Sequence, residues 1–216
     1  SNAIAAFISF EWRSDSAPFD AWMRGEAPLP ALATQGAELF YGKAGCSACH
    51  SGPLLTDQAF HAMASPQLGP GKTERFETNQ RDIGRMRVTN RADDIYAFRT
   101  PSLRNVIATA PYGHAGGHAD LRAFLRFHAD PVAGLQTYTP QAVLPAFTPA
   151  KDDWAIVHDK AEAAAIQKAV KQPANPLTDT EADAILAFLE SLTDPVAIAG
   201  RLGIPASVPS GLPIDR

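Results

Sequence analysis

The sequence has few cysteines, a small net charge and no long apolar run. It has two cysteines in 216 residues, which excludes a disulfide-rich scaffold. Its 19 Lys and Arg residues face 23 Asp and Glu residues, and the net charge of −4 does not favour a nucleic-acid partner. The longest apolar stretch, residues 3–10, is well short of the roughly 18 residues that cross a bilayer, so no membrane span is expected.

The rest of the composition is typical of a globular chain with many turns. Hydrophobic residues make up 45% of the chain and charged residues 19%, so there is enough apolar surface to form a core. The 15 glycines and 18 prolines together exceed the usual proportion and indicate short helices joined by loops.

Apolar spacing predicts a helix just before the two cysteines. Leu32, Gly36, Leu39 and Phe40 lie on one helical face and lead into a glycine turn at residues 42–45. Residues 51–100 show little periodicity and contain several Pro and Gly turns. Such a stretch is a poor core by itself and is expected to wrap around something else.

Further helices are predicted in the second half of the chain. Asp120 is expected to cap a helix that places His128 on an apolar face and ends before Pro131. An alanine-rich stretch predicts a helix over about 152–172, and a capping box that begins at Thr178 predicts another over 178–192. No strand pattern competes with these helices, so the fold class is mainly α.

The two cysteines belong to a short motif that carries chemistry. Residues 46–50 read C-S-A-C-H, which is the attachment motif of c-type haem. One turn places Cys46 and Cys49 for thioether bonds to the two haem vinyl groups, and His50 falls beneath the iron as its proximal ligand. The motif predicts one covalent haem c.

Three alternatives compete with the haem interpretation: a thioredoxin-type dithiol, a zinc half-site and a chance pair. A thioredoxin motif follows a strand in a βαβ unit, whereas here a helix and a glycine turn are expected. A zinc site would need a second Cys or His pair at short spacing, and no other cysteine exists. The pattern therefore favours haem c.

The second axial position of the iron has several candidate ligands. His128 is the candidate predicted to lie on an apolar helical face, where a histidine otherwise needs a buried hydrogen-bond partner. The spacing alone leaves open whether it binds iron or is a hydrogen-bonded histidine. The other candidates are Met23, Met63, Met86, His61, His114, His118 and His158.

Several segments together match a known pattern and identify a resemblance. The chain resembles the C-terminal haem domain of the bacterial di-haem cytochrome c peroxidase/MauG family, and the match covers most of residues 4–195. The resemblance implies a cytochrome c-like haem domain with long irregular loops. The matching segments are residues 16–20, 42–53, 82–85, 98–106 and 110–116, with the helix of 177–192.

The resemblance also implies ligands. In the family the distal ligand follows the Pro-Tyr-x-His motif at a set distance, as Met in the peroxidases or Tyr in MauG, and the equivalent residue is His128. A low-spin iron with two histidine ligands is therefore expected. The family also holds a calcium ion between its two haem domains through backbone oxygens, and Thr109 and Pro111 occupy those positions.

Three other polar side chains belong to the segments that match the family. His114 is expected to be a supporting hydrogen-bond partner and not an iron ligand. Arg85 and Arg104 could pair with haem propionates or form surface ion pairs, and the sequence leaves both possibilities open.

The resemblance divides the chain into three parts. Residues 1–18 are expected to contain an expression-tag remnant, Ser1-Asn2-Ala3, and the last helix of a missing N-terminal haem domain. The haem domain is expected over 19–194. A proline-rich extended tail is expected over 195–216.

The implied function is electron transfer within a periplasmic di-haem enzyme. The missing N-terminal domain would reduce hydrogen peroxide, or act as a MauG-like oxidase, with a small redox protein as electron donor. No catalytic residue is then expected in this fragment. The periplasm follows because c-type haem is attached outside the bacterial cytoplasm. A stand-alone monohaem cytochrome c carrier is the main alternative, and a degenerate haem domain that only binds protein is a third.

Overall fold

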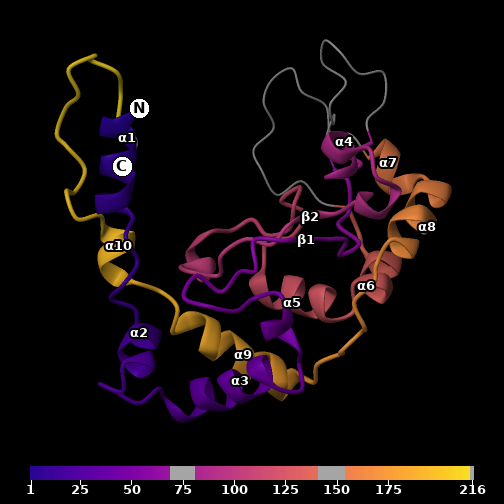
Figure 1. Cartoon of the computed structure of the whole chain (residues 1–216), viewed down its shortest axis with the longest axis horizontal. Coiled ribbons are helices and arrows are strands. Elements are labelled where there is room, and N and C mark those ends of the chain that lie inside the picture. Colours follow the sequence, from indigo (N-terminus) through magenta and orange to yellow (C-terminus); the bar gives the residue numbers. More distant parts are fainter. Residues whose placement is uncertain (69–80, 141–153, 215–216) are drawn as a thin grey trace.

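The computed structural model describes residues 1–68, 81–140 and 154–214, and short helices and long loops dominate it (Figure 1). This confirms the mainly α class. Its α-helices are α1 (Asn2–Glu11), α2 (Pro18–Met23), α3 (Ala31–Tyr41), α4 (Met86–Thr89), α5 (Leu121–Ala129), α6 (Pro131–Thr137), α7 (Ala155–His158), α8 (Lys160–Lys168), α9 (Asp179–Glu190) and α10 (Pro195–Ala199). Three 3-10 turns are η1 (Cys46–Ala48), η2 (Ala92–Asp94) and η3 (Val106–Ala108).

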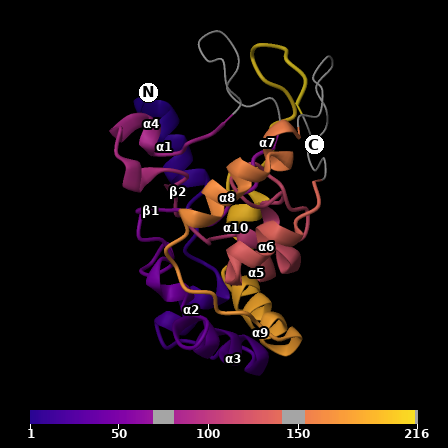
Figure 2. The ribbon, with the colours of Figure 1, turned by 90° about the vertical axis from the view of Figure 1, so that its right-hand side faces the viewer.

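Helices α3 and α9 form the base of the molecule and lie side by side in both views (Figures 1 and 2). Gly36 permits this approach, since the backbone of Ala184 in α9 fills the space where a Cβ atom would be. Phe40 and Phe188 meet across the pair with ring centroids 5.0 Å apart. As predicted, Thr178 and Glu181 form a capping box at the start of α9.

Helix α5 lies above this base and contributes to two apolar clusters. Asp120 caps it, because the Oδ1 atom accepts a hydrogen bond of 2.8 Å from the Ala123 N–H. Leu121 and Leu125 pack against the cluster around α3 and α9. Phe127, on another face, belongs to a second cluster that reaches α6 and α8. Helix α5 therefore connects the two halves of the core.

The stretch predicted to be irregular has little regular structure in its described part. Strands β1 (Phe60–His61) and β2 (Phe98–Arg99) form a two-stranded antiparallel pair in which Phe60 lies opposite Arg99. Sequence periodicity could not reveal strands of two residues. They hold the loop that follows η1 against the loop that precedes η3.

The alanine-rich stretch differs from its prediction. Residues 152 and 153 lie outside the described residues, and the remainder forms α7 and α8 instead of one helix reaching residue 172. Asp159 causes the break, because its Oδ1 atom accepts hydrogen bonds from Ala161 N and Glu162 N at 2.9 and 3.1 Å. An N-cap residue has a non-helical backbone, so the helix restarts there. Helices α2 and α6, each introduced by a proline, are too short to show a periodic pattern.

The C-terminal segment also differs in part from the extended tail that was expected. It starts with α10, capped by Asp194, whose carboxylate is fully buried. Burial opposes the charge of Asp194, but hydrogen bonds from four backbone N–H groups lower its pKa. Residues 201–214 contain no helix and return beside α1 (Figure 1), where the Leu202 N–H donates to Glu11 Oε2 at 2.8 Å. None of the described helices is both long and apolar enough to span a membrane.

The contact at Gly36 generates a stability prediction. Gly36→Ala forces a methyl group against the α9 backbone and the Phe188 Cβ atom, 2.9 Å away, so we expect a loss of about 1–3 kcal/mol or more. In a domain of this size that loss lowers the thermal midpoint by at least about 2 °C. Gln35→Ala, on the exposed face of the same helix, is the matched control. Equal midpoints for the two variants would contradict the packing described.

Candidate haem c site

The C-x-x-C-H motif folds as one tight turn at the end of α3. Gly45 has a left-handed backbone, with φ at 69°, and starts η1. The Cys46 carbonyl oxygen then accepts hydrogen bonds from the N–H groups of Cys49 and His50, at 3.2 and 2.9 Å. The turn holds both thiols and the imidazole in one compact unit, which is what double attachment of a haem above a histidine requires.

A backbone carbonyl fixes the state of the His50 ring. The His50 Nδ1 atom lies 3.0 Å from the Leu55 carbonyl oxygen. Since a carbonyl oxygen only accepts, Nδ1 must carry the hydrogen, and Nε2 keeps the lone pair that a metal needs. Leu55 has a left-handed φ of 48° and a fully buried side chain, so the core holds this carbonyl in place.

His128 of α5 faces His50 across the site. The two ring centroids are 6.3 Å apart, with an angle of 55° between the ring planes. Burial and the neighbouring His50 lower the pKa of His128 to about 4. Burial also lowers the pKa of His50, although the hydrogen bond to Leu55 opposes this. Both imidazoles are therefore neutral at pH 7, the form that ligates metals.

The spacing of the two rings fits a metal between them. A ligating imidazole nitrogen lies about 2 Å from its metal, and the ring centre is about 1 Å farther away because the ring bonds are about 1.3–1.4 Å long. Two imidazoles that held one metal from opposite sides would thus have centroids about 6 Å apart, and the observed separation is 6.3 Å. The assignment of His50 and His128 as iron ligands stays a prediction, and this geometry supports it.

The two thiols do not have the character of a redox dithiol. Burial raises the pKa of Cys46 to about 11 and also raises the pKa of Cys49. Thioredoxin-type and other reactive cysteines have a lowered pKa. Both thiols are free and protonated at neutral pH, as expected for groups that are modified once and then keep a structural role.

The other histidine candidates for the distal position have different surroundings. His61 bonds through both ring nitrogens, to Asp57 and Gln172. His114 Nε2 lies 3.0 Å from Asp82 Oδ2, and its ring stacks on a phenylalanine, which fits the supporting role expected for it. His118 is buried among aromatic rings. His158 is exposed in α7.

The methionine candidates have no comparable setting. Met23 is 63% exposed at the end of α2, and Met86 begins the short helix α4. Met63 follows β1 in the loop and is half-buried. His128 is the candidate for which the structure records a ring contact with His50.

The two arginines form ion pairs within the protein. Arg104 donates two hydrogen bonds to the Asp20 carboxylate, at 2.8 and 2.7 Å, and two more to the Pro53 carbonyl oxygen. It therefore joins α2 to the loop that follows the haem motif. Arg85 lies 3.6 Å from Asp94 and above the Phe60 ring. The Arg104–Asp20 pair is largely buried, whereas Arg85 is more exposed. Pairing of either arginine with a haem propionate stays a prediction.

The residues expected to bind calcium lie on the loop between η3 and α5. Thr109 is exposed at the end of η3, where its hydroxyl donates to the Val106 carbonyl oxygen at 2.9 Å. Pro111 follows two residues later and is half-buried. The calcium site stays a prediction.

Sequence reasoning missed two features of the site. The role of the Leu55 carbonyl could not be predicted from the sequence, because every residue type has a backbone carbonyl that can accept a hydrogen bond. Asp57 and His61 lie beside Cys49. Their spacing of four residues was visible, but their turn-rich surroundings gave no reason to fold them over the motif.

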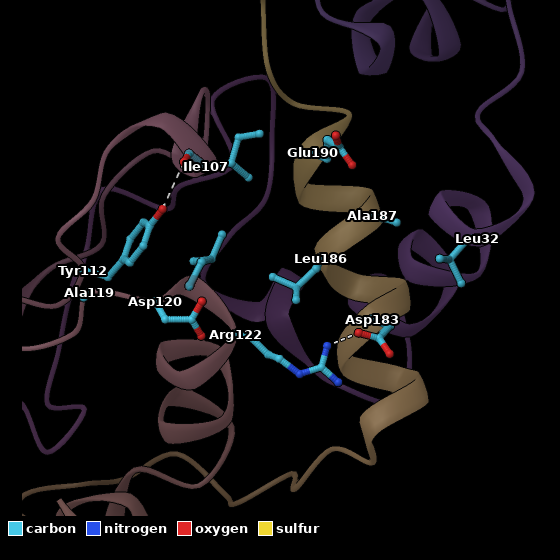
Figure 3. Close-up of a pocket in the computed structure, with 11 residues that line it drawn as sticks. Leu32, Ile107, Tyr112, Ala119, Asp120, Arg122, Asp183, Leu186, Ala187 and Glu190 are labelled. Atoms are coloured by element: carbon cyan, nitrogen blue, oxygen red, sulfur yellow. Dashed lines mark hydrogen bonds and ion pairs between the residues drawn. The ribbon is translucent and has the colours of Figure 1, made fainter. Parts of the chain in front are cut away.

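A surface pocket of about 580 Å³ lies apart from the predicted haem ligands (Figure 3). It lies between α9 and the N-terminal end of α5, where Arg122 forms an ion pair with Asp183. None of its lining residues is a predicted haem ligand, since His128 lies near the other end of α5.

Comparison with known proteins confirms the resemblance. No protein-family model matches the chain. A cytochrome c peroxidase of Denitromonas iodatirespirans is 40% identical over an alignment of 131 residues that covers 51% of this chain and 35% of the relative. The methylamine utilization protein MauG of Methylorubrum extorquens is 41% identical over an alignment of 130 residues that covers 57% of this chain and 33% of the relative. The chain thus spans about a third of the length of these curated relatives.

Solved structures show the same fold. A MauG-like protein associated with microbial copper homeostasis matches with a TM-score of 0.57 and 27% identity, over 86% of this chain and 50% of its own. A variant of a diheme peroxidase from Burkholderia thailandensis matches with a TM-score of 0.56, over 85% of this chain and 47% of its own. Its 22% identity supports a shared fold alone.

The lowered pKa of His128 generates a pH prediction for the haem-free chain. Its pKa is 6.5 when unperturbed and about 4 in the folded chain, so between these values the unfolded chain binds a proton that the folded chain does not. The free energy of unfolding therefore falls as the pH drops through this window, by about 3 kcal/mol at about 1.4 kcal/mol per pKa unit. Urea unfolding at pH 7 and pH 4 measures the fall.

The control separates His128 from the other groups that titrate in the same window. His128→Leu should lose most of this pH dependence, whereas His158→Leu, at an exposed position, should keep it. Equal pH dependence in the wild-type chain and His128→Leu would contradict the prediction.

Proposed function

Because the chain is homologous to di-haem cytochrome c peroxidases and MauG over about half of its length, we propose that it is the electron-transfer haem c domain of a larger protein of that family. Cys46 and Cys49 would attach the haem, and His50 and His128 would hold its iron. The larger protein is a periplasmic hydrogen peroxide reductase or a MauG-like oxidase. Its peroxide site belongs to an N-terminal haem domain outside residues 1–216.

One observation carries the proposal more than any other: two neutral imidazoles face each other beside an attachment motif. The ring centroids of His50 and His128 are 6.3 Å apart, and His50 comes directly after Cys49 in the same turn. The donors fit a haem iron, because neutral nitrogen ligands on both sides are typical of low-spin electron-transfer haems.

The protein residues would control access and orientation. When bound, the haem supplies an iron that accepts and releases one electron. The hydrogen bond to Leu55 keeps the His50 ring oriented and holds the Nδ1 proton away from the ligating side. Leu125, one turn before His128, contributes apolar surface beside it. With His50 and His128 both holding the iron, peroxide would find no free position there, and the site would suit electron transfer better than peroxide reduction.

The remaining parts of the proposal concern partners. A small redox protein supplies electrons to this domain, and the N-terminal haem domain receives them. A calcium ion held by the backbone oxygens of Thr109 and Pro111 joins the two domains. Carbonyl oxygens suit this hard cation, and the exposed position of Thr109 leaves its backbone accessible to another domain.

A stand-alone monohaem electron carrier is the second candidate function. The observation that favours it is the single C-x-x-C-H motif in 216 residues. The two functions differ in what precedes Ile4 in the natural gene product. A second C-x-x-C-H motif there supports the di-haem enzyme, and its absence supports the carrier.

The ligand assignment predicts a visible spectrum. The haem-loaded chain should be six-coordinate and low-spin, and His128→Ala should convert it to high-spin because one axial donor is lost. His128→Met should restore low-spin character with a raised reduction potential. His114→Ala, at a side chain that is 40% exposed, should leave the spectrum unchanged. A spectrum that stays low-spin in His128→Ala would exclude His128 as the ligand.

The division of labour predicts peroxide turnover. The natural full-length protein should reduce hydrogen peroxide with a reduced donor, and residues 1–216 with their haem should show little turnover because both axial positions are filled. His128→Ala in the short chain should raise its weak activity, since it opens a coordination position. The measurement is donor oxidation at fixed peroxide. Turnover by the short chain that equals that of the full-length protein would refute this assignment.

A further inference from the structure

Three side chains with metal-binding atoms meet beside the haem motif. One ligand atom from each of Cys49, Asp57 and His61 lies within 4.8 Å of the other two. The backbone helps to assemble them, because the Asp57 N–H donates to the Cys49 carbonyl oxygen at 2.7 Å. The Asp57 Oδ2 atom lies 2.8 Å from His61 Nε2. A thiol, a carboxylate and an imidazole are the donor types found in zinc sites.

The dimensions of the cluster are close to those of a tetrahedral site. Zinc binds sulfur at about 2.3 Å and nitrogen at about 2.0 Å, so the ligand atoms of one ion are about 3–4 Å apart. The ligand atoms of the cluster lie within 4.8 Å of one another, so binding one ion requires them to move closer by about 1 Å. The side chains of His61 and Asp57 are 25% and 23% exposed, so an ion can reach them from solvent.

Gln172 provides an independent observation. Its Nε2 atom lies 3.0 Å from His61 Nδ1, while its buried Oε1 atom has no hydrogen-bond partner among the described residues. Rotation of the amide by half a turn lets Oε1 accept the Nδ1 proton of His61. The His61 Nε2 lone pair is then free for a metal, in the arrangement by which outer-shell acceptors orient metal-bound histidines.

We propose that, before haem attachment, Cys49, Asp57 and His61 bind one Zn²⁺ ion, with water as the fourth ligand. Binding displaces the thiol proton of Cys49 and leaves a thiolate on the metal. The sequence shows no second Cys or His pair at short spacing for a zinc site. In the fold, Asp57 from the loop and His61 from β1 come close to Cys49.

Haem attachment removes the site. The Cys49 thiol adds across a haem vinyl group: a sulfur–carbon bond forms, and the hydrogen goes to the neighbouring vinyl carbon. The resulting thioether has no negative charge to offer the ion. The metal and the haem therefore compete for one sulfur atom, and bound Zn²⁺ delays maturation of the chain.

The test uses the whole chain produced without haem attachment and stripped of metal by a chelator. Titration with Co²⁺ should show one equivalent that carries a thiolate-to-cobalt absorption band and the strong visible bands of a tetrahedral site. Added Zn²⁺ should displace the cobalt. The haem-loaded chain should give no thiolate band. Binding of equal affinity by the haem-loaded chain would overturn the proposal.

Matched variants identify the ligands. Cys49→Ser should abolish the thiolate band, and His61→Gln and Asp57→Asn should each weaken binding by more than about tenfold. Cys46→Ser should retain the site, because Cys46 is outside the cluster. His114→Gln, which alters another His–Asp pair, should also retain it. Circular dichroism shows whether each variant keeps its helices.

Two outcomes would refute this ligand set. If Cys46→Ser weakens binding as much as Cys49→Ser, the metal is held by a simple dithiol. If His61→Gln binds cobalt as tightly as His114→Gln, His61 is not a ligand. If the chain is unfolded without haem, His61→Gln and His114→Gln should bind cobalt equally, because the three ligands are then not held together.

Discussion

The hydrogen bond between His50 Nδ1 and the Leu55 carbonyl oxygen is the interaction on which the candidate site depends. It assigns the ring hydrogen, and so decides which nitrogen can ligate a metal. The carbonyl keeps its direction because Leu55 has an uncommon left-handed backbone and a fully buried side chain. Leu55 packs into the cluster formed by α3 and α9, so the close helix contact at Gly36 indirectly supports the orientation of His50. Stability of the base and preorganisation of the site are therefore linked.

Helix α5 imposes the second constraint. One face places Leu121 and Leu125 on the base, and another places Phe127 in the second cluster. A helix held from both sides has little freedom to rotate, so His128 has a defined distance from His50. Phe124 limits the His128 ring further, with its own ring centroid 5.4 Å away. Burial in this packing disfavours the charged form of both imidazoles and keeps them neutral at pH 7, which links the packing to the ligand chemistry.

Local chemistry was readable from the sequence where one short segment contains the whole cause. The turn that holds Cys46 to His50, the Asp120 cap and the apolar spacing of His128 are such cases, and the resemblance added the family and the distal position. Features that depend on distant or backbone partners were not readable. Asp159 is an exception to this division: its cap is local, but the alanine-rich residues around it favour one continuous helix and hid the break. The carbonyl of Leu55 acts through the backbone, and its left-handed conformation is uncommon for a leucine.

Asp57 makes contacts that matter both before and after haem attachment. Its Oδ1 atom accepts the Ala59 N–H, its Oδ2 atom contacts His61, and its own N–H donates to Cys49. These contacts hold the loop against the haem motif whether or not the sulfur of Cys49 is modified. Once that sulfur is a thioether, the cluster keeps its carboxylate and imidazole but loses the thiolate that would bind zinc most strongly. The backbone contacts that organise the loop for the haem are thus the contacts that assemble the zinc ligands, and the chemical state of one sulfur atom decides which of the two can bind.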